Sequence, residues 1–188
     1  DFVMKVLVTG VNGFIGSHIV DFLLGQGADV YCTSLSENPK NVRHVKDKIK
    51  LVILDITKKT VFKKIISDVK PDFIFHMAAQ TYVMPSWEDI ENTFMTNIFG
   101  TLYLLEAVRK AKIDPVICIA CSSAEYGLTS EEEMPIKETK DFRPSSPYAV
   151  SKITTDMLGY LYWRAYGMKI IRARFFNTIG PRKTGSAV

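Results

Sequence analysis

The chain has 188 residues, and 47% of them are hydrophobic, which is enough apolar material for one substantial core. Lys and Arg (24) exceed Asp and Glu (20), and this net charge of +4 is too small and too dispersed to indicate nucleic acid. We find no apolar run of the roughly 18 residues that a membrane span needs, and no signal-peptide pattern. The three cysteines are not at metal-ligand spacing, so we expect reduced thiols, no metal site, no membrane or nucleic-acid partner, and a cytoplasmic protein.

The predicted elements alternate between strand and helix. In chain order we expect a strand at 5–9, a helix at 14–24, a strand at 29–33, a polar connection at 36–48, a strand at 50–54, a helix at 58–69, a strand at 72–76, a long helix at 86–111, a strand at 115–120, a loop at 122–146, a helix at 147–166 and a strand at 168–174. The strands read as continuous Val, Ile and Phe runs, which is typical of a parallel sheet buried on both faces. Right-handed crossovers then predict an α/β fold with a Rossmann-type doubly wound parallel sheet.

A glycine-rich turn lies between the first strand and the first helix. Glycines allow a tight turn and a close approach of the backbone to a pyrophosphate, and the helix N-terminus offers free N–H groups to the anion. A plain glycine-rich loop is the alternative, but the flanking strand and helix favour a dinucleotide site. The residues expected to bind the cofactor here are Gly10, Asn12, Gly13, Phe14, Ile15 and Gly16.

Tyr148 and Lys152 are four residues apart in a predicted helix, so their side chains share one face. An ammonium beside a phenol lowers the phenol's pKa from about 10 toward working pH. A phenol tuned in this way can exchange the proton that accompanies hydride transfer at a carbonyl or alcohol. The spacing is also common in amphipathic helices without any catalytic role, so other residues must support this interpretation.

Six motifs occur in the order in which they occur in the extended short-chain dehydrogenase/reductases. They are the Gly10-x-x-Gly13-x-x-Gly16 turn, Asp55-Ile56, His76 to Gln80, Asn97 to Thr101, Ser122-Ser123 with Tyr148 and Lys152, and Arg174 to Pro181. The chain resembles this superfamily over nearly its whole length, and within it the NAD(P)-dependent nucleotide-sugar epimerases and dehydratases. The motifs look most like the branch of GDP-mannose 4,6-dehydratases and GDP-4-keto-6-deoxymannose reductases.

The resemblance assigns roles to individual residues. Tyr148 would be the acid/base, Ser122 would hydrogen-bond the reacting oxygen, and Lys152 would hold the nicotinamide ribose. Asn97 would help to position the site, because an amide in mid-helix is otherwise slightly unfavourable. We interpret His76 as a structural histidine at the end of a strand. The other residues expected to bind the cofactor are Asp55, Ile56, Ala78, Ala79, Gln80 and Phe176, and those expected to contact the substrate are Ser123 and Asn177.

The end of the second strand should set the choice between NAD and NADP. An acidic residue there binds the ribose 2′-hydroxyl, whereas an arginine accommodates a 2′-phosphate. Ser34 occupies the position of the acid, and Lys40 or Arg43 could reach a phosphate from the following connection. Both cofactors remain possible, and the sequence favours NADP.

Residue 124 narrows the choice of reaction that the protein could catalyse. The 4,6-dehydratases typically carry a glutamate two places past the Ser122 position, and this chain has Ala124, whose methyl group cannot transfer a proton. Glu125, one place along, need not point inward. The sequence therefore favours oxidation or reduction at C4 of a nucleotide sugar, with a GDP-4-keto-6-deoxymannose reductase as the first interpretation. A GDP-mannose 4,6-dehydratase, a 4-epimerase and a non-catalytic dinucleotide-binding sensor or scaffold remain alternatives.

The resemblance also predicts the domain organisation and the oligomeric state. Extended members carry a C-terminal substrate domain after the Gly-Pro motif, so we expect a cofactor domain over residues 1–181 and the start of a truncated substrate domain at 182–188. In the family, the helix before the fifth strand and the Tyr148 helix commonly pair across a dimer. A homodimer is therefore expected.

Overall fold

A computed structural model of the chain describes residues 3–183. Six parallel strands form one sheet in the order β3-β2-β1-β4-β5-β6. They are β1 (Lys5–Thr9), β2 (Asp29–Ser34), β3 (Lys50–Ile53), β4 (Phe73–His76), β5 (Val116–Ser122) and β6 (Lys169–Phe175). The order runs outward in both directions from β1, which confirms the predicted doubly wound sheet. The predicted start of a second domain at 182–188 lies almost entirely outside the described residues.

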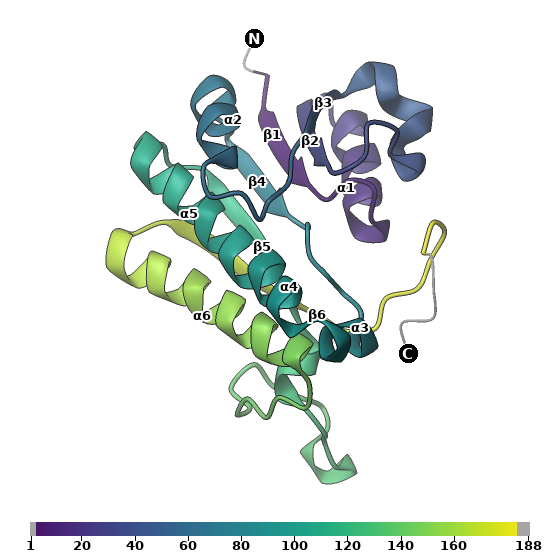
Figure 1. Cartoon of the computed structure of the whole chain (residues 1–188), viewed down its shortest axis with the longest axis vertical. Coiled ribbons are helices and arrows are strands. Elements are labelled where there is room, and N and C mark those ends of the chain that lie inside the picture. Colours follow the sequence, from purple (N-terminus) through teal and green to yellow (C-terminus); the bar gives the residue numbers. More distant parts are fainter. Residues whose placement is uncertain (1–2, 184–188) are drawn as a thin grey trace.

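Helices cover the two faces of the sheet unequally (Figure 1). One face carries α2 (Val61–Val69), α5 (Gly100–Ala111) and α6 (Pro147–Tyr166). The other carries α1 (Phe14–Gly25) and the 3-10 helix η1 (Lys40–Lys48). Among the described residues, no helix combines the length and the apolarity needed to cross a membrane.

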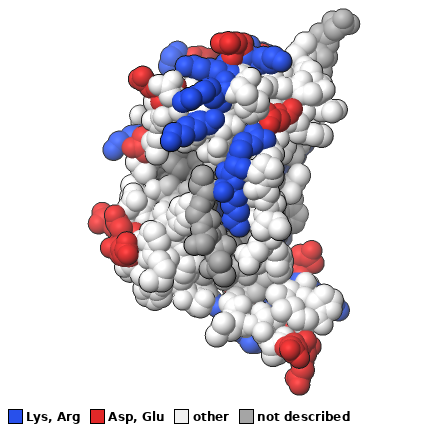
Figure 2. Space-filling model, turned by 90° about the vertical axis from the view of Figure 1, so that its right-hand side faces the viewer, with Lys and Arg blue, Asp and Glu red and all other residues white. Residues whose placement is uncertain are grey.

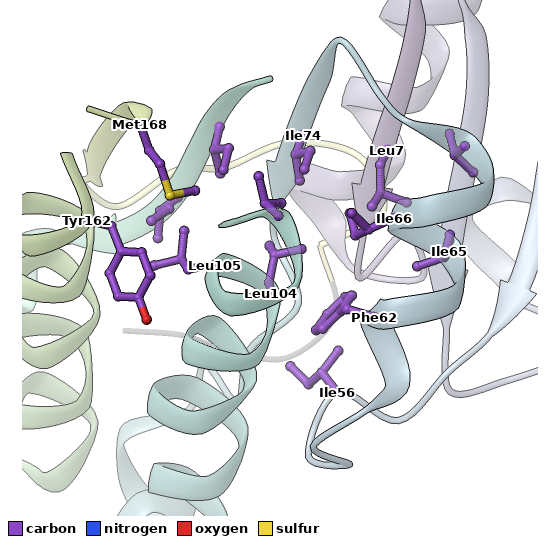
Figure 3. Close-up of a cluster of buried hydrophobic side chains, with 14 of the residues drawn as sticks. Leu7, Ile56, Phe62, Ile65, Ile66, Ile74, Leu104, Leu105, Tyr162 and Met168 are labelled. Atoms are coloured by element: carbon purple, nitrogen blue, oxygen red, sulfur yellow. The ribbon is translucent and has the colours of Figure 1, made fainter. Parts of the chain in front are cut away.

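Each face has its own hydrophobic core. The larger core lies under α2, α5 and α6, where Phe62 and Ile66 of α2 pack with Leu104 of α5 and Ile74 of β4 (Figure 3). The smaller core lies under α1 and η1, and it includes the fully buried Val42. Strand residues therefore contact apolar side chains on both faces, which explains the continuous apolar runs of the sequence.

The polar connection predicted at 36–48 does join β2 to β3, and within it Lys40–Lys48 forms the 3-10 helix η1, which the sequence did not indicate. Its backbone departs from helical geometry at Val42 and Val45. Val42 is fully buried in the core under α1, with Val45 packed beside it. The burial of these two valines orders a segment whose composition is otherwise polar.

The long helical stretch predicted at 86–111 is helical, but it is not one α-helix. The segment consists of α3 (Val83–Glu88), α4 (Ile90–Phe94), a π-helical turn η2 (Met95–Phe99) and α5. Asp89 separates α3 from α4 because its backbone is not helical, and its carboxylate accepts a hydrogen bond from the Asn92 N–H. The π turn carries Asn97, which is buried. Turns of this kind in longer helices often mark functional positions.

Candidate active site

The glycine turn after β1 fits tightly against the segment after β4. Gly10 has φ +72°, and a Cβ on it would lie 2.7 Å from the Ala78 backbone. A Cβ on Gly16 would lie 2.6 Å from the Gly10 carbonyl oxygen. No side chain caps the N-terminus of α1, which begins at Phe14 after Gly13. The turn therefore leaves the first N–H groups of α1 without a side-chain acceptor.

The other residues predicted in the turn take different positions. Asn12 is exposed and receives hydrogen bonds from Asn41 of η1, which ties the turn to that helix. The side chains of Phe14 and Ile15 line an apolar groove beside Phe175. These two residues could contribute to an anion site only through their backbone N–H groups.

The residues after β2 and β3 lie beside the turn at the same edge of the sheet. Ser34 is buried at the end of β2, and its hydroxyl accepts a hydrogen bond from the Ser36 N–H at 3.0 Å. Asp55 is half-buried, and its hydrogen bonds from the Thr57 backbone and hydroxyl hold its carboxyl pKa below the ordinary value. Ile56 is buried in the large core, where it packs on Gly100.

Asn97 connects the segment after β4 to α6. Its carboxamide oxygen accepts from the Gln80 N–H at 2.8 Å, and its Nδ2 donates to the Gln80 carbonyl at 3.0 Å and to the Ser151 hydroxyl at 2.9 Å. The Ser151 hydroxyl donates in turn to the Tyr148 carbonyl at 2.7 Å. Ala78 and Ala79, just before Gln80, are half-buried. The amide in the π turn thus has a structural purpose, which is to hold two functional segments together.

Tyr148, Lys152 and Ser122 converge where α6 meets the end of β5. All three are buried, and the Lys152 Nζ lies 5.9 Å from the centre of the Tyr148 ring. The Nζ donates to the Ala120 carbonyl at 2.7 Å. The Ser122 side chain lies close enough to the Tyr148 phenol to lower the pKa of that phenol. The phenol, the ammonium and the hydroxyl therefore form one group, as the four-residue spacing predicts.

The prediction that Lys152 lowers the pKa of the Tyr148 phenol is wrong for the chain by itself. Burial raises the pKa of Tyr148, and the Ser122 side chain opposes this only in part. Burial also lowers the pKa of Lys152 from its usual value. The phenol is thus held in its protonated form, ready to act as a proton donor. A periodicity argument could not reveal this, because desolvation depends on the packing around the pair.

His76 has the environment of a structural histidine. It is buried, and its two ring nitrogens lie 2.9 Å from the Thr9 hydroxyl and 3.2 Å from the Thr101 hydroxyl. Burial lowers its pKa to about 3, so the imidazole is neutral. The Thr9 hydroxyl also accepts from the Ala78 N–H at 3.0 Å, which fixes the segment that faces Gly10.

The residues predicted to contact substrate are the most open ones. Ser123 is half-buried at the start of the short 3-10 turn η3 (Ser123–Tyr126). Phe176 and Asn177 are exposed just after β6, and the Phe176 ring lies 6.3 Å from that of Tyr126. All three are at the end of the sheet that carries Ser122, but they make no joint contact within the described residues.

Sequence reasoning missed several residues that support the site. The Ser86 hydroxyl accepts from the Tyr148 N–H at 3.1 Å, next to the Ser146 cap of α6. Glu125, Asp156 and Arg174 form a buried charged cluster behind Ser122. One signal was available, because Asp156 lies four residues after Lys152 on the same helix face. Nothing in the sequence marked Ser86.

Comparisons with known proteins agree with this geometry. The family model described as GDP-mannose 4,6 dehydratase matches residues 7–188. The GDP-mannose 4,6-dehydratase of Vibrio cholerae is 35% identical over 191 residues, which cover 95% of this chain and 51% of that protein. The chain therefore spans about half the length of the curated relatives it matches.

Two solved structures are similar at the level of fold and sequence. The UDP-glucose 4-epimerase of Thermus thermophilus in complex with NAD has a TM-score of 0.88 and 36% identity, covering 96% of this chain and 58% of that one. The UDP-glucose 4-epimerase of Thermotoga maritima with UDP-glucose has a TM-score of 0.87 and 33% identity, covering 95% and 57%. Because the family match includes nearly the whole sheet and every segment of the site described above, the chain belongs to the GDP-mannose 4,6-dehydratase family.

Proposed function

We propose that the protein transfers hydride between a nicotinamide cofactor and C4 of a nucleotide sugar, with a GDP-4-keto-6-deoxymannose as the first candidate substrate. The observation that carries this proposal is the convergence of Tyr148, Ser122 and Lys152 in one buried group. Parallel sheets of this type bind ligands at the carboxyl ends of their strands. The group lies at that edge, as does the glycine turn.

The residues at this edge fit a dinucleotide. Gly10 and Gly16 leave room for a close backbone approach, and the uncapped start of α1 offers N–H groups to a pyrophosphate. Ala78 and Ala79 present small side chains on the opposite side. Lys152 would hold the nicotinamide ribose, and Asp55 would lie near the adenine. When bound, the cofactor supplies or accepts the hydride.

Residues of the chain would bind the C4 oxygen of the sugar and supply its proton. The Ser122 hydroxyl and the Tyr148 phenol would both hydrogen-bond the C4 oxygen, which orients the carbonyl carbon. Tyr148 would then give its proton to that oxygen as negative charge develops on it, and solvent would reprotonate the phenolate. The Lys152 ammonium would stabilise the phenolate. Asn97 would keep α6 and the Gln80 segment in register throughout.

The surroundings of residue 124 support plain redox chemistry over dehydration. Ala124 carries a methyl group, which cannot assist removal of the C5 proton or loss of the C6 hydroxyl. The Glu125 carboxylate cannot replace the missing acid, because it points inward to the Ser122 N–H and Arg174. A buried carboxylate with these partners is turned away from a bound sugar.

NADP is the cofactor that we propose. Ser34 brings no negative charge to the end of β2, so a 2′-phosphate would meet no repulsion there. Lys40 and Arg43 are exposed on η1, which the Asn41 contacts hold against the glycine turn. Figure 2 shows Lys and Arg side chains gathered on the face that carries α1 and η1. Tighter binding of NADPH than of NADH, measured by calorimetry, would support this choice.

A substrate panel tests the reaction. The full-length protein with NADPH and GDP-4-keto-6-deoxymannose should oxidise one cofactor for each sugar reduced, and it should form no 4-keto product from GDP-mannose. A 4-keto-6-deoxy product from GDP-mannose would contradict the argument from Ala124. Cofactor binding without turnover of any nucleotide sugar would instead support a sensor or scaffold.

A 4-epimerase is the second candidate, because the two solved structures described above are UDP-glucose 4-epimerases and because epimerisation also needs only the Ser, Tyr and Lys group. An epimerase would convert UDP-glucose to UDP-galactose with no net oxidation of the cofactor. The same panel, followed by product analysis, therefore separates the two activities.

We also propose a homodimer and a cytoplasmic location. Helix α6 lies beside α5 on one face of the sheet (Figure 1), and α6 carries exposed apolar side chains. On α6, Val150, Met157 and Leu161 follow one another at spacings of seven and four residues, which places them in one stripe.

Three free cysteines suit a reducing compartment. Residues 1–181 would form the cofactor domain, and a further domain would complete the sugar pocket.

A further inference from the structure

A buried charged cluster lies directly behind Ser122. The Glu125 and Asp156 side chains are both fully buried. The Arg174 Nε lies 3.3 Å from the Glu125 Oε2 and 2.9 Å from the Asp156 Oδ2, and Arg172 pairs with the other oxygen of Asp156 at 2.5 Å. Two guanidinium groups thus face two carboxylates, and no metal ion is needed to balance them.

Glu125 connects this cluster to the catalytic group through the backbone. Its Oε1 accepts a hydrogen bond from the Ser122 N–H at 2.8 Å, and the Ser122 hydroxyl accepts one from the Ala124 N–H at 3.1 Å. These two bonds form a capping box around η3. The Glu125 side chain therefore holds the Ser122 backbone in the same turn whose Ala124 N–H holds the Ser122 hydroxyl.

A second capping box in the same loop serves as an internal comparison. Ser130 and Glu133 repeat the arrangement around the 3-10 turn η4 (Glu131–Glu133), with Glu133 partly exposed and paired with Lys140. Its ion pair with Lys140 holds the pKa of Glu133 down at about 2, whereas burial raises the pKa of Glu125 to about 7. A cap needs no burial, so the burial of Glu125 requires another explanation.

We propose that Glu125 is a positioning residue: its ionised carboxylate, held by Arg174, fixes Ser122 and supplies negative charge to Tyr148 and Lys152, and its protonation weakens both effects. This inference rests on the proposed function of the site. The titratable and charged groups facing Glu125 are Cys121 of β5, Tyr148, Lys152 and Asp156 of α6, and Arg174 of β6.

The charge on Glu125 shifts the pKa values of Tyr148 and Lys152 in a definite direction. The negative charge of Glu125 raises the pKa of Tyr148 and opposes the fall that burial causes in the pKa of Lys152. Ionised Glu125 therefore favours a protonated phenol beside a charged ammonium, which is the state that carbonyl reduction requires. Because the pKa of Glu125 is about 7, Glu125 gains its charge, and with it these effects on Tyr148 and Lys152, as the pH rises through neutrality.

Two titrations test the inference without any turnover. In cofactor-free protein labelled with 13C at the glutamate carboxyls, the Glu125 signal, assigned with E125Q, should titrate near pH 7. The ionisation of Tyr148 is followed by absorbance, as the difference between protein with Tyr148 and the Y148F variant. The pH midpoint of this ionisation should be lower by roughly half a pH unit or more in E125Q. The matched variant E133Q, which removes the charge of the exposed capping box, should leave this midpoint unchanged.

Kinetics then test the coupling to catalysis. We expect kcat of the wild-type enzyme to increase as the pH rises through 7. In E125Q, kcat should no longer increase over this range and should be up to about 100-fold lower than in the wild type, with little change in KM. E125D, which keeps the charge but reaches Ser122 less well, should lower kcat yet keep the rise. Titration of Glu125 near its ordinary pKa, or an unchanged Tyr148 midpoint in E125Q, would overturn the inference. If no nucleotide sugar is turned over, the proposed function fails, and the two titrations still decide the role of Glu125.

Discussion

At the residue scale, most polar atoms of the site are engaged in holding one another. Asn97 makes three side-chain hydrogen bonds to Gln80 and Ser151, and Ser86 holds the Tyr148 N–H. Such buried contacts leave few polar groups free to rearrange, and they hold the part of α6 that carries Tyr148 in place. Preorganisation of this kind is what proton transfer to a bound oxygen requires.

Replacement of Asn97 tests that rigidity. N97A would leave the Gln80 backbone groups and the Ser151 hydroxyl without their buried partner, so we expect a loss of about 2 to 4 kcal/mol in the free energy of unfolding. Urea denaturation measures this loss. N92A, on the exposed part of α4, should change stability by less than about 0.5 kcal/mol. Equal effects of the two changes would contradict a special role for Asn97.

The predictability of individual residues followed their local patterns. Tyr148 and Lys152 could be found because a helix fixes the meaning of a four-residue spacing. The raised pKa of Tyr148 and the inward turn of Glu125 could not, since both depend on β5, β6 and α6 packing together. Ser86 lies 62 residues before Tyr148, and no local pattern links them.

At the scale of elements, the strands and most helix ends were predicted well because they follow apolar runs and caps. The segment from Val83 to Ala111 was not, since one helical pattern runs across α3, α4, η2 and α5. Asp89 interrupts it by capping α4, and the side-chain contacts of Asn97 accompany the π turn. Burial of Val42 likewise ordered η1 against a polar composition.

Two glycines of α1 provide a matched test of the turn. A Cβ on Gly16 would lie 2.6 Å from the Gly10 carbonyl oxygen, whereas a Cβ on Gly25 would meet nothing within 4 Å. We expect G16A to lose about 1 to 3 kcal/mol of stability and to weaken cofactor binding. G25A should gain up to about 1 kcal/mol, because alanine suits a helix better than glycine. Urea denaturation and calorimetry with NADPH measure both effects, and a harmless G16A would contradict the close packing.

At the scale of the whole molecule, the two faces of the sheet differ in what they leave exposed. The outer surface of α6 presents the stripe of Val150, Met157 and Leu161 to solvent, with exposed fractions of 39%, 39% and 53%. Contiguous apolar patches of this kind mark interaction sites. A two-fold pairing of this surface with itself would bury the stripe in both subunits.

A charge placed in the stripe tests the homodimer. L161R should raise the dimer dissociation constant by roughly 30-fold or more, because it buries an unpaired cation at the proposed interface. Sedimentation equilibrium measures the constant. Leu128 is 88% exposed on the loop after β5 and is not part of the α6 stripe, so L128R should leave the assembly unchanged. A dimer that L161R does not weaken would place the interface elsewhere.

The most direct test of the central claim is the effect of Y148F on hydride transfer. The phenylalanine keeps the ring of Tyr148 and its packing but removes the proton that the C4 oxygen needs. With full-length protein, NADPH and GDP-4-keto-6-deoxymannose, we predict that kcat falls by about 100- to 10,000-fold while cofactor affinity is nearly unchanged. Unchanged turnover in Y148F would contradict the assignment of Tyr148 as the acid/base.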